Sequence, residues 1–100
     1  MVTKEFPKDE MYGLTNQMRR SSASIPTNIA EGCGRDSQAE LTRFFQIAMG
    51  SSSELEYQLL LAHDLQYLNE KAFLELSTEL SEVRRTLNAF IQKIKHDMSI

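Results

Sequence analysis

Apolar residues recur every three or four positions along three stretches of this chain, the spacing that places side chains on one side of an α-helix. The stripes are formed by Leu14, Met18, Ile25 and Ile29, then Leu41, Phe45, Ala48, Ser52, Leu55, Leu59 and Ala62, and finally Phe73, Leu76, Leu80, Val83, Leu87, Phe90 and Ile94. The pattern predicts helices over about residues 11–32, 37–68 and 70–96. Because the repeat alternates between three and four and the connections are short, we expect an all-α fold, an antiparallel up-and-down helical bundle.

Polar residues and glycines mark the first boundary. Gly32 and Gly34 are expected to end the first helix, and Ser37 with Glu40 three residues later forms a capping box for the second. Pro26 lies inside the first helix, where it removes one backbone hydrogen bond at a cost of about 3 kcal/mol in a straight helix. We therefore expect a bent first helix and not a break.

The middle helix carries a second apolar face. Its members are Phe44, Ile47, Leu61, Leu65 and Leu68. Two apolar faces predict neighbours on two sides, and the small residues from Gly50 to Ser53 permit close approach. Asn69 is expected to cap the third helix.

Length and composition place the chain among ordinary globular proteins. Its 100 residues, 41% hydrophobic and 25% charged, correspond to one domain over residues 1–100. No signal peptide or membrane span is recognisable, so we expect a cytoplasmic protein. The lone Cys33 has no cysteine partner for a disulfide or for zinc. A net charge of −3 argues against strong sequence-independent binding of nucleic acid.

No catalytic constellation emerges from the polar residues. His63 has neither the Glu-x-x-His spacing of di-iron bundles nor an HExxH motif, and nucleotide-binding glycine motifs are absent. Glu54 and Glu56 are two residues apart and point to different sides of a helix. We expect Glu54 to be buried against Arg19 or Arg20 in a structural polar layer. The sequence therefore predicts no enzyme, no metal and no cofactor.

Several strings resemble the 23S rRNA intervening-sequence protein family, also called four-helix bundle proteins. They are Tyr12-Gly13-Leu14-Thr15, Gln17-Met18-Arg19-Arg20, Ser24-Ile25-Pro26, Asn28-Ile29-Ala30-Glu31-Gly32, Ala48-Met49-Gly50-Ser51, Glu54-Leu55-Glu56 and Val83-Arg84-Arg85. The resemblance extends from Phe6 to about Lys95. It implies a bacterial, non-enzymatic bundle that assembles as a ring-like homo-oligomer, a pentamer, without an established biochemical activity.

The family has a further helix before the Phe-Pro turn, whereas only Met1 to Glu5 precede Phe6 here. We therefore expect one bundle helix to be missing and oligomerisation to cover the exposed faces. The polar residues of the family strings, expected to be mainly structural, are Arg19, Arg20, Asn28, Glu31 and Glu54.

Two function classes stay open. The first is a homo-oligomeric scaffold or adaptor associated with rRNA intervening sequences, which binds a protein partner. The second is a direct RNA-binding protein similar to the accessory variability determinant of retroelements, and its candidate contacts are Arg19, Arg20, Arg35 and Arg43. No membrane partner is expected.

Overall fold

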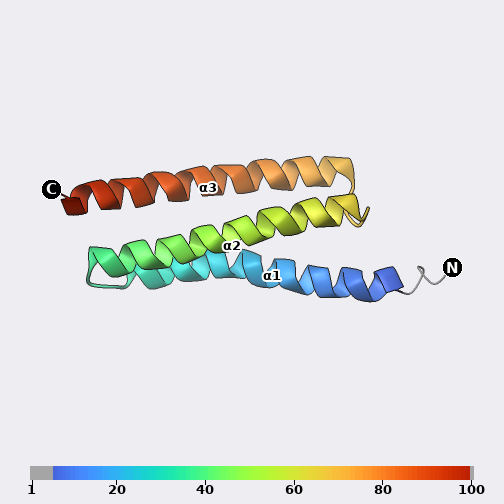
Figure 1. Cartoon of the computed structure of the whole chain (residues 1–100), viewed down its shortest axis with the longest axis horizontal. Helices are drawn as coiled ribbons and strands as arrows, with labels where there is room; N and C mark the ends of the chain where they lie inside the picture. Colours follow the sequence, from blue (N-terminus) through green and yellow to red (C-terminus); the bar gives the residue numbers. More distant parts are fainter. Residues whose placement is uncertain (1–5, 100) are drawn as a thin grey trace.

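The computed structural model describes residues 6–99, which fold into three long α-helices without a strand. α1 spans Phe6–Cys33, α2 spans Gln38–Asp64 and α3 spans Glu70–Ser99. The helices lie side by side in an elongated body of 62 × 22 × 15 Å, and α2 lies between the other two (Figure 1). The prediction of an all-α fold with three long helices is confirmed. The expectation for Met1–Glu5, that they stand in place of a longer helix, lies outside the described residues.

α1 begins five residues earlier than the apolar pattern indicated and ends one residue later. Pro7 does not delay the start, because a proline in the first turn loses no intrahelical hydrogen bond. The helix also continues through Pro26 without a break, as predicted. Gly32 lies within the last turn, and the amide of Gly34 closes the helix on the carbonyls of Ala30 and Glu31 at 3.2 Å.

α2 begins at the predicted cap and ends four residues before the predicted boundary. The Ser37 hydroxyl accepts a hydrogen bond from the Glu40 amide at 3.0 Å, which confirms the serine half of the capping box. At the other end, the Tyr67 amide donates to the carbonyl of Ala62 and the Gln66 amide to that of His63. These bonds form a Schellman motif, with Gln66 at a φ of 64° in the position that usually holds glycine. Because position 66 is not a glycine, the sequence did not indicate that the helix would end at Asp64.

Asn69 caps α3 as predicted. Its side-chain oxygen accepts a hydrogen bond from the Ala72 amide at 2.8 Å, which satisfies one of the free donors of the first turn. The helix then runs to Ser99, three residues beyond the predicted end.

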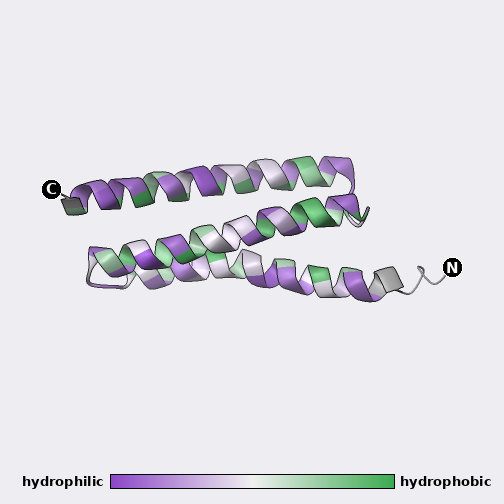
Figure 2. Cartoon of the chain, viewed as in Figure 1, coloured by the Kyte–Doolittle hydropathy of each residue, from purple (hydrophilic) through white to green (hydrophobic). Residues whose placement is uncertain are grey.

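The core lies where α2 meets its two neighbours. It is formed by Ile25 of α1, Phe45, Ala48 and Leu59 of α2, and Leu80, Leu87, Ile91 and Ile94 of α3. Each leucine or isoleucine buried in this way stabilises the fold by about 1.5–3 kcal/mol. Along α3, hydrophobic residues recur among a larger number of hydrophilic ones (Figure 2).

α2 packs against both α1 and α3, as its two apolar faces predicted, whereas α1 and α3 do not pack against each other within residues 6–99. Two members of the second apolar face remain partly exposed. Ile47 is 40% exposed and Leu65 is 41% exposed. Because Ile47 and Leu65 are 18 residues apart, five full turns of an α-helix, they leave apolar surface open along one side of α2.

Candidate functional site

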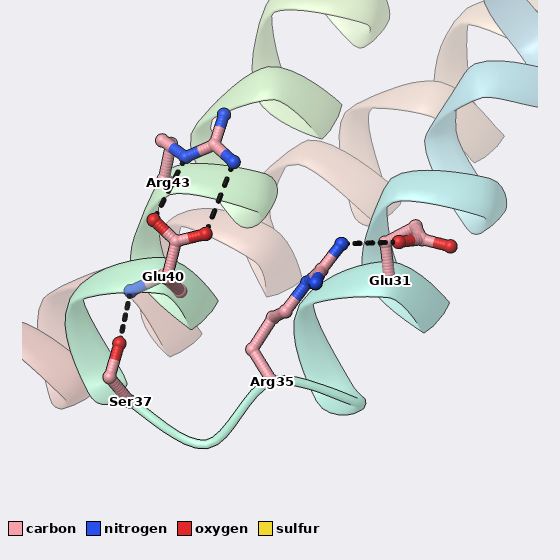
Figure 3. A network of polar contacts seen from close by, with 5 residues as sticks. All are labelled: Glu31, Arg35, Ser37, Glu40 and Arg43. Atoms are coloured by element: carbon pink, nitrogen blue, oxygen red, sulfur yellow. Dashed lines mark hydrogen bonds and ion pairs between the residues drawn. The ribbon is translucent and has the colours of Figure 1, made fainter.

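Two of the four candidate RNA-contacting arginines meet at the turn between α1 and α2 (Figure 3). Arg35 pairs with Glu31 at 2.9 Å, one turn back along α1. Arg43 forms a two-point contact with Glu40, with its Nε at 3.2 Å and its Nη2 at 3.1 Å from the carboxylate oxygens. Both guanidinium groups also lie over the ring of Phe44, at 5.0 Å and 4.4 Å from its centre. One partly buried aromatic ring thus holds two arginines in place.

The charges at this turn compensate one another. The hydrogen bond from Arg43 lowers the pKa of Glu40, and the same contact raises the pKa of Arg43. Each arginine has a carboxylate partner, so the two pairs together carry no net charge. Because both pairs are exposed to solvent, they contribute little to stability. A phosphate would have to compete with Glu31 and Glu40 for these guanidinium groups.

The other two candidate contacts, Arg19 and Arg20, lie elsewhere on α1. Both side chains are exposed, and neither forms a hydrogen bond or ion pair within the described part of the chain. Arg20 and Arg35 are 15 residues apart, about 22 Å along a helix axis. The structure therefore does not gather the four arginines into one basic patch.

The predicted polar layer around Glu54 is wrong. Glu54 is exposed and forms no ion pair with Arg19 or Arg20, because it lies on the outer side of α2 and not toward α1. The polar contact between α1 and α2 is made by Ser51 instead, whose hydroxyl is 2.7 Å from that of Ser24.

Asn28 belongs to this serine contact and not to a network with Glu31. Its side-chain amide donates to the hydroxyl of Ser24 at 2.9 Å and to the carbonyl of Ser24 at 2.8 Å. The amide thereby fixes the Ser24 side chain against Ser51 of α2. Of the five polar residues drawn from the family strings, Asn28 is the one that supports a contact between helices, through its hydrogen bonds to Ser24 within α1.

Arg84 makes the main polar contact between α2 and α3, and sequence reasoning missed it. Its guanidinium donates to the hydroxyls of Ser52 and Ser53 at 3.2 and 3.1 Å, and to the Glu56 carboxylate at 3.0 Å. Ser52 is fully buried, and its hydroxyl also donates to the carbonyl of Met49. The available signal was the run of serines in α2 together with an arginine adjoining the apolar stripe of α3.

His63 lies at the turn between α2 and α3. Its ring stacks on Phe73 with the centroids 4.2 Å apart, and its Nε2 atom is 2.6 Å from a carboxylate oxygen of Glu70. These contacts hold the start of α3 against the end of α2. Within residues 6–99 no three His, Cys, Asp or Glu side chains are grouped closely enough to bind a metal ion. Likewise, none of the described helices is both long and apolar enough to cross a membrane.

An open groove of about 790 Å³ lies between α1 and α3. Its floor is formed by Leu55, Leu59 and Ala62 of α2, and its end near the α2–α3 turn is bounded by Tyr67 and Leu68. We call it the helix groove. The side chains on its two walls include Met11, Leu14, Met18, Arg19 and Pro26 from α1 and Leu76, Glu79, Leu80 and Val83 from α3.

A sequence model described as 23S rRNA-intervening sequence protein matches residues 1–89. This chain belongs to that family. The match includes every candidate residue discussed above, and it ends before the last turns of α3. No curated protein matches the chain significantly.

Membership of the 23S rRNA-intervening sequence protein family agrees with the helical fold and with the predicted resemblance. Within this family member, the polar residues inside the matched region divide into two groups. Asn28, Ser24, Ser51 and Arg84 fix one helix against another, whereas Arg19 and Arg20 point to solvent.

Proposed function

We propose that this chain is a non-enzymatic scaffold that assembles with copies of itself and binds a protein partner, in association with rRNA intervening sequences. The observation that carries the proposal is the amount of apolar side chain left open on a helical body without a grouped catalytic or metal-binding cluster among residues 6–99. Exposed apolar surface of this kind marks sites of protein association.

The scaffold uses two separate surfaces. The first is the outer side of α2, where Ile47 is 40% and Tyr57 is 65% exposed. The second is the helix groove on the opposite side of the core. We assign self-assembly into a ring-like homo-oligomer, with a pentamer as the expected size, to the outer side of α2, which leaves the helix groove for the partner.

Size-exclusion chromatography with light scattering tests this proposal, with absorbance at 260 and 280 nm recorded on protein purified without nuclease. We expect a defined oligomer free of nucleic acid. Ile47→Glu should shift the mass toward the monomer, since a carboxylate would then lie in the assembled interface. Gln92→Glu, an exposed glutamine on α3 that acquires the same charge, is the control. A monomeric wild-type protein at all concentrations would contradict self-assembly.

Direct RNA binding is the second candidate. The observation that favours it is that Arg19 and Arg20 are exposed without a carboxylate partner in the described residues. Against it stand the net charge of −3 and the pairing of Arg35 and Arg43 with glutamates. Phosphate binding predicts that copurified nucleic acid is stripped by salt and lost in an Arg19→Glu, Arg20→Glu variant.

A further inference from the structure

We draw no further inference here: the strongest candidate, the outer side of α2 where Ile47, Gly50 and Tyr57 are exposed, is the surface already assigned to self-assembly, and nothing in residues 6–99 shows what covers it.

Discussion

Replacing Arg84 with methionine should destabilise the packing of α3 on α2. Methionine keeps the apolar stem and removes the guanidinium, so the change isolates the three hydrogen bonds. The two bonds to serine hydroxyls contribute about 1 kcal/mol each, while the contact with Glu56 contributes about 0.5 kcal/mol or less because that carboxylate is 57% exposed. The expected loss is about 2 kcal/mol. It corresponds to a fall in Tm of about 8–16 °C for a domain of this size.

Urea unfolding followed by circular dichroism at 222 nm measures this loss directly. Arg85→Met is the matched control, because Arg85 is exposed, carries the same charge and forms no hydrogen bond within the described residues. A double-mutant cycle with Ser52→Ala should give a coupling of about 1 kcal/mol. Equal losses for Arg84→Met and Arg85→Met, or no coupling with Ser52, would refute the assignment of Arg84 as the main polar contact between these helices.

Four further substitutions test local features of the fold. Gly32→Ala should lower the free energy of unfolding by about 1 kcal/mol, since an added Cβ would lie 3.0 Å from a side-chain carbon of α2. Gly50→Ala, where the space around the glycine is open, should instead raise it by up to about 1 kcal/mol in the same urea assay. Gln66→Gly should raise stability by about 0.5–1 kcal/mol, because glycine adopts the positive φ without strain, and an unchanged midpoint would count against the Schellman stop. The pKa of Glu40 lies below its ordinary value of 4.5, so its pairing is fully present above that pH and is lost as the pH falls through the lowered pKa. A carboxyl NMR titration should show this, with Arg43→Met returning the pKa to the ordinary value.

The helix boundaries that could be predicted are those set by side chains with a specific local hydrogen bond. Ser37 and Asn69 were recognisable because each accepts a bond from the amide three residues ahead. The end of α2 could not be predicted in the same way. There the stop depends on Gln66 adopting a left-handed backbone conformation, and the apolar residues that follow it continue the helical pattern. Tertiary contacts decide that conformation.

The polar contacts between helices were less predictable than the apolar ones. Apolar spacing identifies which side of a helix is buried, but a buried polar side chain needs a specific partner, which depends on helix register. Glu54 was expected to meet an arginine of α1 and lies exposed instead, while Arg84, on a different helix, meets Ser52 and Ser53. The spacing of apolar residues along one helix does not determine its register against a neighbouring helix, so neither contact could be predicted. Arg43 adjoins Phe44 in the sequence, whereas Arg35 lies nine residues before it and reaches the ring only because the turn between α1 and α2 is formed.

The apolar repeat of α3 contains both fully buried and partly exposed positions. A helix that only had to pack on α2 would need a single apolar row, such as Leu80, Leu87 and Ile94. Leu76 and Val83 are each 39% exposed, so they are only partly buried and leave apolar surface in water, at a cost of about 25 cal/mol per Å². Covering this surface would remove that cost. The same seven-residue repeat that predicts α3 as a helix therefore also contains the apolar positions that α2 leaves partly exposed.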